Sequence, residues 1–211
     1  MGQTIGFRRL SGPRQTTMAF TRRHLPHWIP EETALFVTWR LAGPLPPQTE
    51  APGVEQCSRA PFLRRHDGLD RARTGPFWLQ DPRVACVVVD ALLYGETERR
   101  FYELHAWVVM PNHVHAIFQP LAAMPTIMRW LKGRTGRVAN QILCRAGKPF
   151  WQDESFDHWI RSAEELQYLI DYAENNPVKA GLVETKEQWR WSSAGWLTDD
   201  GSRSSVPQGQ G

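Results

Sequence analysis

The element order that the sequence predicts is strand, helix, strand, strand, helix, strand, helix, and it indicates an α+β fold. We expect a ferredoxin-like antiparallel sheet with helices packed on one face. Two observations support this prediction. Short runs rich in β-branched and aromatic residues alternate with longer segments of helical periodicity. The chain has 211 residues, 41% hydrophobic and 22% charged, which suits one ordinary globular core.

The first half of the chain contains one strong strand and one helix. Residues 33–41 (TALFVTWRL) are β-branched and aromatic and predict a strand. Residues 42–77 are interrupted by repeated prolines and predict a long connection with little regular structure. A helix is expected over residues 82–95, although its run 87–89 consists of valines, which favour strands.

The middle of the chain predicts a hairpin and a basic helix. Residues 102–110 and 113–119 have strand composition, and Pro111-Asn112 between them indicates a tight turn. Residues 125–145 have the periodicity of an amphipathic helix.

The last regular elements are an extended segment at residues 155–161 and a helix. Ser162 is the expected N-cap of this helix, and Glu165 is expected to complete a capping box. The helix should end near Asn175, because Pro177 disfavours helical geometry at the residue before it.

These patterns divide the chain into three parts. Residues 1–30 form a basic N-terminal arm, and residues 31–197 form a single domain that includes the proline-rich connection. Residues 198–211 are rich in Ser, Gly and Gln and predict a disordered tail.

The charge distribution favours a polyanionic partner over a neutral one. The formal net charge is only +3, but two blocks contain cations and no acid. They are residues 1–30 and residues 124–148. Cations near phosphates release counterions, so such blocks suit nucleic acid, although a solvated basic face remains the alternative.

The cysteine pattern and hydropathy predict a cytoplasmic location, and a nucleic-acid partner implies association with the nucleoid there. The three cysteines form no CxxC pair, which favours reduced thiols. No apolar run reaches the roughly 20 residues that span a bilayer, and we expect no membrane association.

Two histidines form a candidate metal site. His113 and His115 are separated by one residue on a predicted strand, so both imidazoles point to the same face, about 7 Å apart at the backbone. Imidazole binds many divalent metals, but a bare HxH pair can also be structural. The tight turn just before His113 favours an accessible site.

A tyrosine on the last helix is the second candidate. Tyr172 lies about 110° around the helix from the centre of its apolar stripe, so we expect it at the flank of the buried face. Such a residue can be a packing tyrosine with a solvated hydroxyl or a nucleophile. Asn176 follows one turn later, where its side-chain oxygen can complete a metal site.

Together these residues suit phosphodiester chemistry. A divalent ion on the two histidines can stabilise charge on a phosphate, and a tyrosine hydroxyl can attack it to form a covalent phosphotyrosine. Mg²⁺ prefers oxygen ligands, so a two-histidine site leans towards Mn²⁺, with Mg²⁺ or Mn²⁺ as the candidate cofactor.

Three separate segments resemble the IS200-like, single-tyrosine HUH transposases. They are AWVVMPNHVHAIF (106–118), residues 150–183 with FWQDESFDHWIR and DYAENNPVKAGLV, and WRWSSA (189–194). The last two resemble the subgroup of REP-associated tyrosine transposases. The resemblance runs from about residue 33 to residue 196.

The resemblance implies a site and a reaction. His113 and His115 match the family's metal histidines, Tyr172 its nucleophile and Asn176 its third ligand, where classical members carry Gln. Tyr168, one turn earlier, is the nearby competitor. The family cleaves single-stranded DNA beside palindromic hairpins and leaves a 5′-phosphotyrosine and a free 3′-OH. The implied partner is therefore single-stranded DNA with a REP-like hairpin.

Several other side chains are candidates for DNA contacts. The basic ones are Arg129, Lys132, Arg134, Arg137 and Arg161. Three tryptophans, Trp130, Trp151 and Trp159, could stack on bases, although core packing is the simpler interpretation. His158 could contact metal or DNA, although a polar residue at a sheet edge is the simpler interpretation, and His105 is interpreted as structural.

Two rival functions stay open at this point. A hairpin-binding protein that no longer cuts would show no metal-dependent nicking. An unrelated HxH metallohydrolase would keep its activity when Tyr172 is replaced by Phe. One tyrosine per chain permits catalysis in cis or in trans, so both a monomer and a homodimer are compatible with the sequence.

Overall fold

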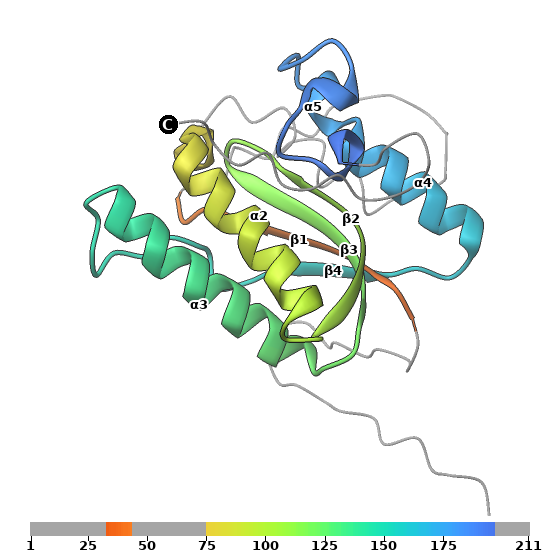
Figure 1. Ribbon diagram of the computed structural model, residues 1–211, viewed down its shortest axis with the longest axis horizontal. Coiled ribbons are helices and arrows are strands. Elements are labelled where there is room, and N and C mark those ends of the chain that lie inside the picture. The colour runs from red at the N-terminus through yellow and green to blue at the C-terminus, as the bar shows by residue number, and fades with distance from the viewer. Residues whose placement is uncertain (1–32, 44–74, 197–211) are drawn as a thin grey trace, which may run out of the picture. The chain divides into compact units, whose positions relative to one another are not determined.

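A four-stranded antiparallel sheet forms the centre of the fold (Figure 1). The computed structural model describes residues 33–43 and 75–196, which fall in one unit, Glu32–Gly211. The strand order is β2-β3-β1-β4. The strands are β1 (Leu35–Arg40), β2 (Tyr102–Val109), β3 (His113–Pro120) and β4 (Phe156–Trp159). All four lie where the sequence predicts them.

The helices also follow the prediction, with short additions. The long helices are α2 (Pro82–Thr97), α3 (Met124–Ile142) and α4 (Ala163–Glu174). The sequence did not predict the short helices, which are η1 (Trp78–Gln80), α5 (Asn176–Lys179), η2 (Lys186–Gln188) and η3 (Ser193–Gly195). The α+β class and the antiparallel sheet are therefore confirmed.

Helices cover both faces of the sheet, whereas the sequence led us to expect them on one. Tyr102 stacks on Phe118, and its hydroxyl donates to the carbonyl of Leu92 in α2, while α3 packs beside α2. On the opposite face, Phe36 and Ile117 pack against α4. Almost all residues of β1 and β3 are buried, whichever face of the sheet their side chains point to. A strand that does not alternate between buried and solvent-exposed side chains needs helices packed on both of its faces.

The start of α4 differs in detail from the predicted capping box. Ser162 caps the helix as expected, because its Oγ accepts from the Glu165 N–H at 3.2 Å. The Glu165 carboxylate accepts from the Arg161 N–H at 2.7 Å and pairs with His158 Nε2 at 2.9 Å. The hydrogen bonds of Glu165 therefore connect the start of α4 to the end of β4.

The outer edge of β2 is covered by the segment 189–193. The N–H of Val109 donates to the carbonyl of Trp191 at 2.8 Å, and the N–H of Trp107 donates to Ser193 Oγ at 3.1 Å. This cover removes unpaired strand groups from one edge of the sheet.

Some predictions fall outside the described residues. They concern the basic arm 1–30, most of the proline-rich connection (44–74) and the tail 198–211. In the part of the chain that is described, no helix is long and apolar enough to cross a membrane.

Candidate active site

His113 and His115 form a buried pair on β3. Both side chains point to the face that carries α4, as strand alternation predicts, and neither is exposed to solvent. Their Nε2 atoms face each other at 3.0 Å, with ring planes at 74°. The pair thus presents two nitrogen atoms to one point.

Each histidine is oriented through its other nitrogen. Nδ1 of His113 lies 2.7 Å from Oδ1 of Asn112, and Nδ1 of His115 lies 2.7 Å from the hydroxyl of Thr38. An amide oxygen only accepts, so Nδ1 of His113 donates to Asn112 and its Nε2 directs a lone pair towards His115. The sequence indicated Asn112 only as a turn residue and gave no role to Thr38.

The geometry of the pair fits a shared metal ion. Two nitrogens that each lie about 2.1 Å from one ion, at neighbouring coordination positions, are about 3.0 Å apart. A partner that fixes the tautomer and orientation of each ring is typical of metal-binding histidines. Among the described residues no group of three or more His, Cys, Asp and Glu side chains could hold a metal.

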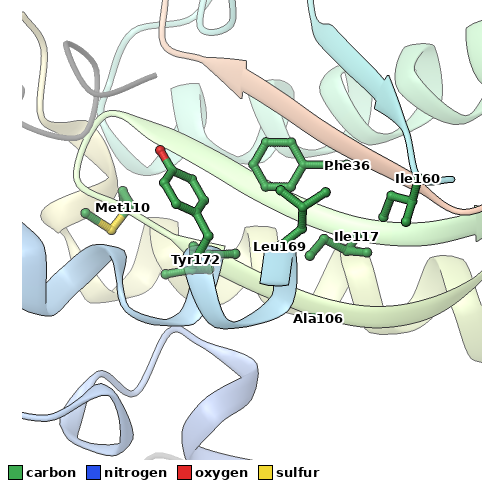
Figure 2. Close-up of a cluster of buried hydrophobic side chains, with 9 residues drawn as sticks. Phe36, Ala106, Met110, Ile117, Ile160, Leu169 and Tyr172 are labelled. Atoms are coloured by element: carbon green, nitrogen blue, oxygen red, sulfur yellow. The ribbon is translucent and has the colours of Figure 1, made fainter. Parts of the chain in front are cut away.

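Tyr172 lies beside this pair in the core. Its ring centroid is 6.1 Å from that of His115, and Phe36 packs against both rings, at 5.1 Å from His115 and 6.1 Å from Tyr172. Figure 2 shows the Tyr172 side chain rising from α4 next to Phe36. The expectation that Tyr172 lies at the flank was wrong, since it is only 6% exposed. Tyr172 is buried because the sheet and the segment after α4 cover its side chain. The angle of a residue around its helix does not predict this burial.

The segment after α4 carries two more polar side chains of interest, Asn176 and Lys179. Asn176 is fully buried at the first residue of α5. Lys179, to which the sequence pattern gave no role, places its ammonium 4.0 Å from the centroid of the Tyr172 ring. A cation over an aromatic face is attracted by the ring electrons, so Lys179 puts a positive charge next to the candidate nucleophile.

Tyr168, the competing tyrosine, lies apart from this cluster. It is 43% exposed, and it is not among the residues of the core cluster that holds Tyr172. The structure therefore favours Tyr172 as the tyrosine beside the histidine pair.

The predicted DNA-contact residues are not gathered around the histidines. Arg129, Arg134 and Arg137 are exposed on α3, on the opposite side of the sheet. Arg161 is exposed next to the start of α4, with its guanidinium 5.4 Å from the ring centroid of Trp159. Lys132 has a structural contact that the sequence did not predict. Its ammonium donates to the carbonyls of Gln152, Asp153 and Glu154 at 3.0, 3.0 and 3.1 Å.

Two further histidines in the described part of the chain lie on β4 and β2. His158 lies on the edge strand β4 and pairs with Glu165. Burial alone raises the pKa of Glu165, but hydrogen bonds from His158 and from the Arg161 N–H outweigh it and hold that pKa below its usual value. His105 is exposed at an irregularity in the β2–β3 register.

Comparison with known proteins shows which class of protein this chain resembles. Residues 89–176 match the family described as "Transposase IS200 like", and this segment includes both histidines, Tyr172 and Asn176. The resemblance to IS200-like transposases found in the sequence is thereby confirmed. Within that class, the curated relatives are REP-associated tyrosine transposases.

Two curated relatives define the extent of the similarity. The REP-associated tyrosine transposase of Escherichia coli (strain K12) is 32% identical over 95 residues, which is 44% of this chain and 55% of that protein. The putative REP-associated tyrosine transposase of Haemophilus influenzae is 27% identical over 103 residues, which is 44% of this chain and 58% of that protein. The matched part is thus about half the length of each relative.

Two solved structures align with the chain. One is a REP-associated tyrosine transposase bound to a REP hairpin, with a TM-score of 0.49 and 20% identity over 90% of this chain and 94% of that one. The other is a putative transposase from Deinococcus radiodurans, with a TM-score of 0.37 and 16% identity over 74% and 96% of the two chains.

Proposed function

We propose that this chain is a metal-dependent transposase that nicks single-stranded DNA beside a palindromic hairpin, with Tyr172 as the nucleophile. One observation carries the proposal: α4 holds Tyr172 next to the oriented pair His113 and His115. A histidine pair with converging Nε2 atoms and a neighbouring tyrosine are the groups that a tyrosine-mediated phosphoryl transfer requires.

Each residue of the site has a separate role in the proposed reaction. His113 and His115 would hold Mn²⁺ or Mg²⁺, with the amide oxygen of Asn176 as the third protein ligand. When bound, the ion stabilises the charge that develops on the scissile phosphate. The Tyr172 oxygen attacks phosphorus and loses its proton, the bond from phosphorus to the 3′ oxygen breaks, and that oxygen takes up a proton. The products are a 5′-phosphotyrosine and a free 3′-OH.

The surroundings of Tyr172 suit this role. Phe36 and the other apolar side chains of the core cluster fix its ring, so the hydroxyl is held in one direction. The same cover limits the access of water, which protects a phosphotyrosine until a DNA 3′-OH rejoins it. The ammonium of Lys179 adds a positive charge near the reacting phosphate.

We further propose that the substrate is a hairpin of the REP type with a single-stranded flank, in the cytoplasm at the nucleoid. The names of both curated relatives associate them with REP elements. The exposed arginines Arg129, Arg137 and Arg161 are available for backbone phosphates. With Lys132 bound to carbonyls, the arginines are the better candidates among the basic side chains.

The test uses labelled single-stranded hairpin oligonucleotides from repeats near the gene, with Mn²⁺, with Mg²⁺ or with EDTA. Denaturing gels report any covalent protein–DNA adduct. We expect a metal-dependent adduct for the wild type and for Tyr168→Phe, and none for Tyr172→Phe.

Two other outcomes would replace the proposal. Hairpin binding without an adduct in either metal would identify a DNA-binding protein that does not cut. Cleavage that persists in Tyr172→Phe would identify hydrolysis by water at the histidine pair.

A further inference from the structure

A partly exposed group of aromatic rings lies on the side of the sheet away from the histidines. We call it the aromatic patch, and it consists of Tyr94 of α2, Phe101 after α2 and Trp130 of α3. Tyr94 and Trp130 are stacked at 6.1 Å with 20° between their planes, and Phe101 meets Trp130 edge-on at 5.5 Å. The patch bridges two helices that lie side by side (Figure 1).

Two arginines border these rings. The guanidinium carbon of Arg134 lies 5.3 Å from the ring centroid of Tyr94 and 6.0 Å from that of Trp130, and that of Arg99 lies 4.8 Å from Phe101. Tyr94 is 43% exposed, so much of its ring contributes nothing to the core. Tyr94 is exposed, Phe101 and Trp130 are half-buried, and rings of this kind beside guanidinium groups form a surface on which nucleobases can stack.

The charge around the patch favours a nucleic-acid strand as the occupant. Trp130, Arg134 and Arg137 follow one another at helical spacing along one stripe of α3, and residues 124–148 contain no acid. Asp90 in α2 and Glu98, just after the end of α2, flank Tyr94 in the sequence. We therefore expect the phosphates of a bound strand to lie along α3. The neutral faces of its bases should lie over Tyr94 and Trp130.

We propose that the aromatic patch is a second DNA-contact site, which stacks unpaired bases of a single strand while Arg134 and Arg137 contact its phosphates. The proposal rests on the proposed function only in taking single-stranded DNA as the ligand. It needs neither the metal nor the nucleophile, because the patch lies on α2 and α3 at one face of the sheet and the histidine pair points to the opposite face, which carries α4.

The test measures binding of a fluorescein-labelled oligothymidine by anisotropy, in EDTA and with Tyr172→Phe as the parent protein, so that no cleavage occurs. Tyr94→Leu removes a stacking ring, and Tyr94→Phe is the matched control that keeps it. We expect about tenfold weaker binding for Tyr94→Leu, near 1.4 kcal/mol. Tyr94→Phe should bind like the parent.

Arg137→Ala tests the phosphate contact separately. The slope of log K against log salt should become less steep by about 0.7 for each phosphate of the single strand that the protein no longer neutralises. Circular dichroism melting of each variant verifies that it is folded.

Photo-crosslinking then locates the strand. An oligonucleotide with 5-iododeoxyuridine should crosslink to peptides that contain Tyr94 or Trp130. Equal affinity of the parent, Tyr94→Leu and Arg137→Ala would overturn the proposal, as would no binding by the parent. These assays contain neither metal nor the Tyr172 hydroxyl. A negative result in them therefore does not bear on the nicking activity, which the adduct assay tests separately.

Discussion

At the residue scale, two short hydrogen bonds determine how the histidine pair can act. Asn112 and Thr38 each bind an Nδ1 atom, which leaves the Nε2 atoms to face each other. The sequence predicted the histidines, because alternation along a strand places His113 and His115 on one face. It could not predict Thr38, because that contact comes from the antiparallel register of β1 against β3.

Thr38→Val tests the orienting role of this hydroxyl. Valine preserves the shape of the side chain but cannot hold Nδ1 of His115, so Mn²⁺ affinity should fall about 10- to 100-fold. Isothermal titration calorimetry measures the affinity. Thr97→Val, at an exposed threonine of α2, is the control and should leave it unchanged. An unchanged affinity in Thr38→Val would remove Thr38 from the site.

At the scale of elements, α2 is positioned by a close contact with β2, and α4 is positioned by contacts at its first turn. The helix α2 approaches β2 closely at Gly95, where an added Cβ would overlap the Tyr102 hydroxyl. The helix α4 is held at its start by Glu165. The sequence predicted both helices and the Ser162 cap, but the pairing of Glu165 with His158 depends on where β4 lies.

Two glycine substitutions separate packing from helix propensity. Gly95→Ala should destabilise the protein by about 1–3 kcal/mol, because Tyr102 is buried and bound to Leu92 and cannot move freely. Gly133→Ala, in α3 with open space around it, should stabilise by up to about 1 kcal/mol. Urea unfolding measures both. Equal effects would mean that α2 and β2 are not in close contact at Gly95.

The contact at the start of α4 predicts a dependence on pH. The pKa of Glu165 is lower in the folded state, so its stabilising effect is complete above the unfolded value of about 4.3 and is lost as pH falls through the folded value. Glu165→Gln should therefore be less stable than the wild type at pH 6, with the difference shrinking towards pH 3. Urea unfolding across this range, with the exposed Glu103→Gln as control, measures it. A difference that grows on acidification would contradict the pairing.

At the scale of the whole molecule, the site depends on segments that are distant in the sequence. The buried Glu174 accepts from Ser193 Oγ at 2.9 Å and from Lys186 Nζ at 2.8 Å, and so joins the end of α4 to the segment that covers β2. The order of elements and the class of fold were predictable because strand and helix patterns are local. The cover on both faces, the burial of Tyr172 and the position of Lys179 were not, because each depends on how distant segments pack.

The most direct test of the proposed chemistry identifies the residue that becomes bonded to DNA. The protein is incubated with a hairpin oligonucleotide and Mn²⁺, the adduct is digested with nuclease and protease, and the peptides are sequenced by mass spectrometry. We predict a nucleotide attached to Tyr172. Attachment to Tyr168, or no modified tyrosine in a reaction that has cleaved the DNA, would contradict the assignment of the nucleophile.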